Sequence, residues 1–99
     1  MYRLTIQYDA PADPVAFDEQ YFGRHVPLCA GIPGLAASTF SKPRVLGAGT
    51  APYLIAELDF TDRDAYQAAM ASAEMGVVAK DADTLPATRA MFVGELRDS

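Results

Sequence analysis

The sequence predicts a single α+β domain, residues 1–99, in which strands and helices follow one another in the order βαββαβ. Three observations support this prediction. A chain of 99 residues has the size of one domain. Several segments alternate apolar and polar residues with the period of a strand, whereas two longer ones repeat apolar residues with the period of a helix. Prolines, glycines and helix-capping residues separate these segments.

Strands are predicted at residues 2–8, 36–41, 53–60 and 89–96. The first is the clearest, because apolar residues at its even positions alternate with polar residues at its odd positions. Residues 53–60 alternate in the same way, with one face formed by Leu54, Ala56, Leu58 and Phe60. Residues 42–52 are rich in glycine and proline, so we expect an irregular connection there.

The first helix is predicted over residues 14–32, after the N-cap residue Asp13. Pro27 lies inside this helix. Its ring lacks a backbone N–H group and crowds the carbonyl four residues earlier, which belongs to Gly23. We therefore expect a kink or a short break between Gly23 and Pro27, with His25 at the bend.

The second helix is predicted after the sequence Thr61-Asp62-Arg63-Asp64, in which a hydroxyl residue is followed three positions later by an acid. Apolar residues with helical spacing follow, up to about Thr84. Gly76 is expected to interrupt this helix, and Ser72 can cap a second helical segment. Pro86 then ends the helical region before the last strand.

This order of elements predicts a ferredoxin-like fold, in which an antiparallel sheet carries both helices on one face. The other face of such a sheet is bare. Apolar and aromatic residues occur on both faces of several predicted strands, and 51% of all residues are hydrophobic. Because two-sided apolar strands are covered on both faces, we predict that two copies pack sheet against sheet as a homodimer. The resulting dimeric α+β barrel is expected to enclose an apolar cavity.

The composition excludes several classes of partner and site. The net charge is −5 and no basic cluster is present, so we expect neither nucleic acid nor a membrane surface as partner. The single cysteine, Cys29, cannot form an intramolecular disulfide, and we expect no metal site from one cysteine and one histidine. The chain starts directly with a strand and has no long apolar stretch, so we expect a cytoplasmic location without signal peptide or membrane span.

His25 and Tyr21 are the strongest candidates for catalysis. Histidine has an ordinary pKa near neutrality, so it can move a proton in an apolar pocket. Tyr21 lies one helical turn earlier and can orient the imidazole or bind a ligand oxygen. Two structural interpretations stay open. His25 can be a surface or capping residue bonded to a carbonyl that Pro27 frees, and Tyr21 can be a core residue with its hydroxyl at the rim.

Further candidates for contact with a ligand are Phe17, Cys29, Tyr53, Glu57 and Phe92. Cys29 follows His25 by one turn, which suggests a nucleophile, although a lone cysteine among apolar neighbours is usually a small buried residue. Glu57 can point into the cavity and pair with Arg3 or His25, or it can be a solvated strand residue. Aromatic residues on strands are first of all packing residues.

The spacing Phe17-x-x-x-Tyr21-Phe22-x-x-His25-x-Pro27-Leu28, followed by Gly31-Ile32-Pro33-Gly34-Leu35, resembles the EthD family. That family is named for a protein linked to the degradation of ethyl tert-butyl ether. Later segments are also similar to it, so the resemblance covers nearly the whole chain. It implies a dimeric α+β barrel.

Proteins related to that family include a methylmuconolactone isomerase and dehydratases or oxygenases that act on polyketides. In the isomerase, the helix histidine that matches His25 is implicated in catalysis, so the resemblance implies a catalytic role for His25. The family often has a tryptophan where this chain has Phe22, and this difference alters the shape of the pocket.

We therefore predict a homodimer that acts on a small apolar oxygenated compound, of the lactone, aromatic-catabolic or polyketide type, by acid/base chemistry without a cofactor. Neither a phosphate-binding glycine loop nor a nucleophile elbow is present, and a haem bound through His25 has no other support. One alternative is a non-catalytic ligand-binding or accessory subunit of a catabolic pathway. Another is a structural dimer whose cavity is filled by its own side chains.

Overall fold

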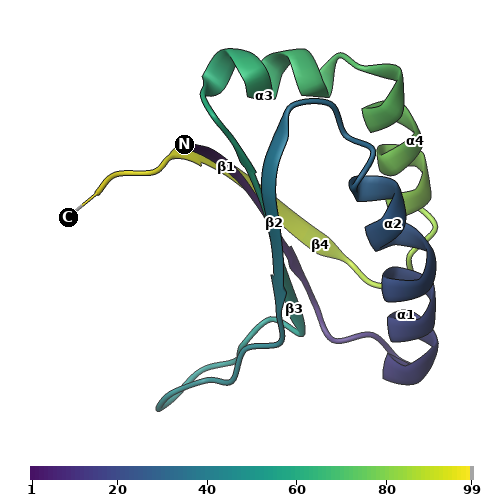
Figure 1. Cartoon of the computed structure of the whole chain (residues 1–99). Coiled ribbons are helices and arrows are strands. Elements are labelled where there is room, and N and C mark those ends of the chain that lie inside the picture. The colour runs from purple at the N-terminus through teal and green to yellow at the C-terminus, as the bar shows by residue number, and fades with distance from the viewer. Residues whose placement is uncertain (99) are drawn as a thin grey trace.

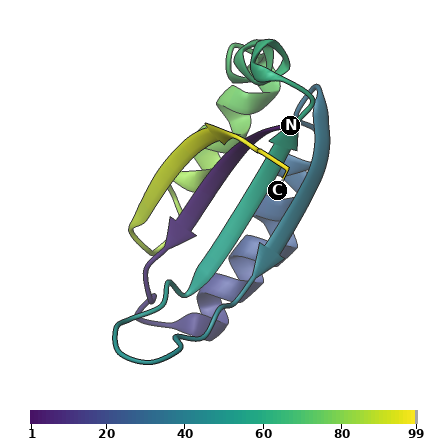
Figure 2. The ribbon, with the colours of Figure 1, turned by 90° about the vertical axis from the view of Figure 1, so that its left-hand side faces the viewer.

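The computed structural model describes residues 1–98 and contains one sheet of four strands. These strands are β1 (Tyr2–Tyr8), β2 (Leu35–Ser41), β3 (Leu54–Phe60) and β4 (Arg89–Glu95). Their order across the sheet is β2-β3-β1-β4, and each neighbouring pair is antiparallel (Figure 2). All four strands lie where the sequence predicts them, with bounds that differ by no more than one residue.

The helices cover one face of the sheet and leave the other bare (Figure 1). Between β1 and β2 the chain forms α1 (Pro14–Gln20), a π-helical turn η1 (Tyr21–His25) and α2 (Val26–Cys29). Between β3 and β4 it forms α3 (Arg63–Met70) and α4 (Ala73–Ala82). The predicted ferredoxin-like fold is thus confirmed. None of the helices within residues 1–98 has the length and apolar character that a membrane span requires.

The π-helical turn η1 occupies the place where the sequence predicts a bend. Because Pro27 has no N–H group, the regular helical bond to the carbonyl of Gly23 cannot form. The N–H of Val26 donates instead to the carbonyl of Tyr21, five residues earlier, which is the π-helical pattern. The helix therefore continues through the proline, and His25 is the last residue of the widened turn.

Capping side chains fix where the helices begin. Asp13 accepts a hydrogen bond of 3.1 Å from an N–H group in the first turn of α1, as predicted. Two predictions for the second helical region are wrong. The cap of α3 is Asp62 rather than Thr61, and the interruption lies at Ser72 rather than at Gly76. The Ser72 hydroxyl restarts the helix by capping α4, so the glycine falls inside a regular helix.

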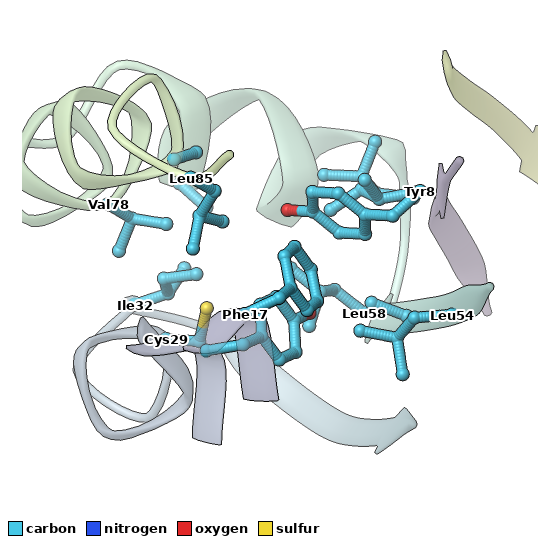
Figure 3. Close-up of a cluster of buried hydrophobic side chains, with 14 of the residues drawn as sticks. Tyr8, Phe17, Cys29, Ile32, Leu54, Leu58, Val78 and Leu85 are labelled. Carbon is cyan, nitrogen blue, oxygen red and sulfur yellow. The ribbon is translucent and has the colours of Figure 1, made fainter. Parts of the chain in front are cut away.

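The core lies between the helices and the covered face of the sheet. From Leu4 onward the even positions of β1 are buried, as are the even positions of β3. The largest fully buried side chains are Tyr8, Phe17, Tyr21, Leu54, Leu58 and Phe60. Figure 3 shows several of these side chains meeting from strands and helices. This packing holds the helices that carry His25 in a fixed position over the sheet.

The bare face of the sheet is more polar than the sequence analysis assumed. At its centre the Arg3 guanidinium donates to Asp59, with Nε–Oδ1 and Nη2–Oδ2 distances of 2.7 and 3.0 Å, and it also pairs with Glu57. The edge strand β4 adds apolar surface to this face through Phe92, which pairs with Thr5 and is 54% exposed. The homodimer stays a prediction, and its strongest apolar support is this edge strand.

Candidate functional site

A largely apolar cavity of about 480 Å³ lies inside the single chain, between the covered face of the sheet and the helices. A cavity of this volume accommodates a small organic molecule. The sequence predicts a cavity enclosed between two copies of the chain, whereas this cavity is formed within one copy. Small residues in the wall, Ala56, Ala79 and Ala82, leave room where larger side chains would fill the interior.

His25 lies in the wall of this cavity and is 2% exposed. Its Nδ1 atom lies 2.9 Å from Oδ2 of Asp81 on α4, and the other carboxylate oxygen of Asp81 lies 2.7 Å from Nε of Arg24. The carboxylate accepts a hydrogen bond from Nδ1–H, which fixes the orientation of the ring. Nε2 is then the nitrogen with a free lone pair, and it can take a proton from a molecule in the cavity.

Tyr21 and Tyr8 extend the polar part of the wall beside the histidine. The Tyr21 ring centroid lies 5.2 Å from that of His25 and 5.3 Å from that of Tyr8. Burial raises the pKa of Tyr8 to about 12 and also raises the pKa of Tyr21. Both hydroxyls therefore stay protonated at neutral pH and can donate hydrogen bonds to a ligand oxygen. The structure brings Tyr21 and His25 together, while the bond that holds the imidazole comes from Asp81.

Cys29 lines the cavity from α2, one turn after His25. It is buried among apolar side chains, and Figure 3 shows its sulfur inside the core cluster. Burial raises the pKa of the thiol to about 11, and the negative charge of Asp81 adds to this rise. The neutral thiol is a poor nucleophile at physiological pH. We therefore interpret Cys29 as an apolar part of the wall.

Phe92 and Phe17 were both predicted to contact a ligand, but only one of them lies at the cavity. Phe92, on the edge strand β4, borders the cavity. Phe17 does not line it. The Phe17 ring is fully buried and stacks on Tyr21, with ring centroids 5.4 Å apart and an interplanar angle of 10°. Phe17 therefore supports the position of Tyr21 from behind.

Tyr53 and Glu57 also lie outside the cavity wall. The Tyr53 hydroxyl, just before β3, donates a hydrogen bond of 2.8 Å to Asp18, next to Lys42, and so connects this end of β3 to α1 at the surface. Glu57 lies on the bare face of the sheet, where it pairs with Arg3. Of the two partners that the sequence suggested for Glu57, the structure shows Arg3.

Two residues of the site were not identified from the sequence. Asp81 lies on a different helix from His25, 56 positions further along the chain, and no local pattern pairs them. Arg89 opens β4 and lines the cavity. A signal for Arg89 did exist, because it falls on the same face of the strand as Met91 and Val93. A positively charged residue beside apolar residues on one face of a strand indicates a candidate contact with a ligand.

Very few residues set the charge of the cavity wall. Within the described part of the chain, the wall contains His25 and Arg89 but no aspartate or glutamate. Across residues 1–98, no group of three or more histidine, cysteine, aspartate or glutamate side chains is placed to hold a metal ion. The available chemistry is therefore that of one imidazole, one guanidinium and tyrosine hydroxyls.

A family model described as the EthD domain matches residues 9–87. The chain belongs to the EthD family. A curated relative of this EthD-family chain is an uncharacterized 11.0 kDa protein from the thcB-thcC intergenic region of Rhodococcus erythropolis. The two are 43% identical over 75 residues, which cover 75% of this chain and 73% of the relative. The family suggested by the residues around His25 is thus confirmed.

Solved structures show the same fold. An EthD family protein from Bacillus halodurans is 33% identical, with a TM-score of 0.86 over 98% of this chain and 99% of that one. A variant of SnoaB, a cofactor-independent oxygenase from Streptomyces nogalater, is 20% identical, with a TM-score of 0.73 over 99% and 94%. A dimeric ferredoxin-like protein of unknown function from Thermobifida fusca is 19% identical, with a TM-score of 0.71 over 96% and 90%.

Proposed function

We propose that this EthD-family protein binds a small, largely apolar, oxygenated compound in the cavity and moves a proton on it through His25, without a cofactor. One observation carries the proposal: the wall of an apolar cavity contains a buried imidazole whose Nδ1 is held by a carboxylate. That arrangement sets Nε2 as a general base, and Asp81 stabilises the imidazolium that forms when Nε2 takes the proton.

The proposed reaction starts with removal of a proton from a carbon next to a carbonyl group. Nε2 of His25 takes this proton, and the electron pair of the C–H bond moves to the carbonyl oxygen, which becomes an enolate. The protonated hydroxyls of Tyr8 and Tyr21 lie near the histidine and can donate to that oxygen. Return of the proton to another carbon or oxygen then gives an isomer, or starts a dehydration.

The fold neighbours support chemistry of this type without fixing the substrate. SnoaB is a cofactor-independent oxygenase with the same fold. We infer that this chain also works without a cofactor, because His25 and the tyrosines in its wall can themselves exchange protons with a ligand. Many lactones, carbonyl products of aromatic breakdown and polyketides contain a C–H bond next to a carbonyl, so these classes fit the proposed step.

We also propose that the protein is a homodimer that pairs through the bare face of its sheet. Figure 2 shows this face uncovered by any helix, and the neighbour from Thermobifida fusca is described as dimeric. Sedimentation equilibrium at micromolar concentration is expected to give twice the mass of one chain. A mass of one chain would reject the dimer and leave the cavity chemistry untouched, because the cavity lies within each chain.

The acid/base proposal is tested with 2-tetralone, an apolar bicyclic ketone with acidic C–H bonds next to its carbonyl. Exchange of these hydrogens in D₂O is followed by ¹H NMR. The wild-type protein is expected to accelerate exchange, and His25→Gln is expected to lose roughly a hundredfold or more of that rate. Asp81→Asn should also lose rate, because the neutral amide cannot balance the positive charge of the imidazolium that forms when His25 takes the proton. Arg44→Gln, in the exposed connection after β2, is the matched control.

The alternative function is ligand binding without turnover. The cavity favours it in one respect, because most of its wall is apolar and such walls suffice for binding. Binding of 2-tetralone, seen as broadened ligand NMR signals, with no acceleration of exchange in the wild type would support this alternative. Full exchange activity in His25→Gln would contradict the proposed role of His25.

A further inference from the structure

Within the cavity, the covered face of the β1–β4 pair changes from polar to apolar along the strands. Three cross-strand pairs on this face line the cavity: Tyr8 with Arg89, Ile6 with Met91, and Leu4 with Val93. Successive pairs are two residues apart, so the three span about 13 Å along the strands. The cavity therefore has a polar end at Tyr8 and Arg89 and an apolar end at Leu4 and Val93.

The helices follow the same division. At the polar end, the last turn of α4 contacts both bases: Asp81 bonds to His25, while the carbonyl of Ala82 accepts from Arg89 Nη1 at 3.3 Å. At the other end the wall comes from Tyr66, Met70 and Met75 of α3 and α4. Methionine side chains adapt to apolar ligands of different shape. Strand and helix residues together thus give the cavity one polar head and one apolar body.

Arg89 places a positive charge at this polar head. Its side chain is about a quarter exposed, and its Nη2 donates to Asp83, a residue that is itself mostly exposed, at 2.9 Å. A guanidinium has five N–H donors, so two bonds to protein leave donors for a ligand. Burial raises the pKa of Tyr8, and the charge of Arg89 opposes this rise, which reflects how close the two groups lie. Asp81 and Asp83 lie behind the wall, which within residues 1–98 contains no carboxylate, so a negatively charged ligand at this end meets the guanidinium of Arg89 first.

We propose that the cavity selects compounds with an apolar ring system and one anionic oxygen, and that Arg89 binds this oxygen. The shared chemistry is an oxyanion on an apolar frame, whether it is a carboxylate present in the free ligand or an enolate formed on the protein. For an enolate formed on the protein, the inference rests on the proposed function. For a carboxylate of the free ligand, it requires only that the cavity binds ligands.

The test compares 2-naphthoate with 2-naphthamide, two bicyclic probes of nearly equal shape that differ in charge. Their dissociation constants are measured by calorimetry at low ionic strength. The wild type is expected to bind naphthoate roughly tenfold more tightly than naphthamide, because a hydrogen bond to a charged group contributes about that factor. Arg89→Gln is expected to lose this preference while naphthamide binding stays within about twofold. Arg44→Gln, an arginine outside the cavity, should leave both constants unchanged.

A second variant guards against a loss of folding in Arg89→Gln, because Arg89 also binds the end of α4. Asp83→Asn removes the exposed carboxylate that partly neutralises Arg89, without touching the cavity wall. It is expected to strengthen naphthoate binding by roughly two- to threefold and to leave naphthamide unchanged. Arg89→Lys keeps the charge and should keep part of the preference.

Equal affinity of the wild type for the two probes, or an unchanged preference in Arg89→Gln, would overturn the proposal. Failure to bind either probe would do so as well. These outcomes are separate from the exchange of 2-tetralone. Intact exchange without a naphthoate preference would reject Arg89 as the oxyanion site and leave His25 as the base. A naphthoate preference without exchange would leave the carboxylate site and reject acid/base catalysis.

Discussion

The two helical segments of this protein lie on the same face of the sheet but pack against it very differently. The first helical segment, α1–η1–α2, fills its contact with the sheet with stacked aromatic rings, among them the fully buried Phe17. The second helical segment, α3–α4, lines the cavity with methionine and alanine and with one aromatic residue, Tyr66. Val93 on the edge strand β4 stays 47% exposed, although it lies on the covered face.

This difference shows how one fold serves for both rigidity and binding. Bulky rings in the first helical segment hold the π turn, and with it His25, in a fixed position. Small and flexible side chains in the second helical segment leave the volume of the cavity open. The catalytic candidate thus belongs to the tightly packed segment, while the space for a ligand lies beside the loosely packed one. Substitutions in the two segments should separate these contributions.

The largest contrast is expected between Phe17→Ala and Met75→Ala. Phe17 is fully enclosed, so its truncation leaves a cavity and should cost about 3–5 kcal/mol of unfolding free energy. Met75 is half-buried and already borders open space, so its truncation should cost less than about 2 kcal/mol. Urea unfolding followed by circular dichroism measures both. Similar losses of unfolding free energy would mean that the second helical segment is packed as tightly as the first.

The second prediction concerns the effect of alkaline pH on Cys29, which lies where the first helical segment meets the cavity. Its thiol has a pKa raised from 9.0 to about 11 by burial. The folded state therefore holds this proton more tightly, so the stabilisation is complete below pH 9 and is lost as the pH rises through 11. Between pH 7 and pH 10.5, urea unfolding should show a larger decrease in the wild type than in Cys29→Ala, by on the order of 2 kcal/mol. The buried tyrosines, whose pKa values are also raised, contribute to the decrease in both proteins.

A related measurement is the reaction of the same thiol with iodoacetamide. At pH 8 the folded protein is expected to react roughly a hundredfold or more slowly than the urea-unfolded chain, because little thiolate is present and the sulfur is buried. Rapid alkylation of the folded protein would contradict the interpretation of Cys29 as a wall residue and would return it to the candidates for catalysis.

The third contrast concerns the break that separates α3 from α4. Ser72 Oγ accepts a hydrogen bond of 3.1 Å from the N–H of Met75 and starts α4. Ser72→Ala is expected to cost about 1 kcal/mol of unfolding free energy. Thr61→Ala is the control, because this hydroxyl residue also precedes a helix while Asp62 provides the cap there. Equal losses in the two variants would mean that the side chain of Ser72 does not define the break.

The smallest effect is expected at Gly76 and has the opposite sign. Gly76 lies inside α4, and a Cβ atom built there meets no atom within 4 Å. Gly76→Ala should therefore raise the unfolding free energy by about 0.5–1 kcal/mol, since alanine restricts the unfolded chain more than glycine does. Thermal unfolding measures this change. A decrease in unfolding free energy would indicate that the second helical segment needs flexibility at the position where the sequence alone predicted a break.

The elements that could be predicted from the sequence are those governed by local physical chemistry. The alternation in residues 2–8 defined a strand and the acid at Asp13 defined a cap. Pro27 together with Gly23 indicated an irregular turn, and the structure has the π-helical turn η1 there in place of a kink or break. The break in the second helix was misplaced because two signals competed there. The glycine at 76 was given more weight than the serine at 72, although a cap stops and restarts a helix more effectively.

The site was predictable only in the part that one helix carries. Tyr21, His25 and Cys29 recur at every fourth position, so their common direction followed from helical spacing. Asp81 and Arg89 join them only through tertiary packing of α4 and β4, which no local pattern encodes. The sequence could not decide between a cavity residue and a solvated residue for Glu57, because alternation tells which strand residues share a face without telling which face the helices cover.

The π turn also makes the length of the chain critical at one point. Each residue of a helix rotates the chain by about 100°, so removing Gly23 to give a regular helix would turn every later residue of that helix by this angle. His25 would leave Asp81, and Cys29 would leave the core. A deletion in residues 21–25 therefore changes the direction of several buried side chains at once. The widened turn is thus a spacer that sets the register of the site.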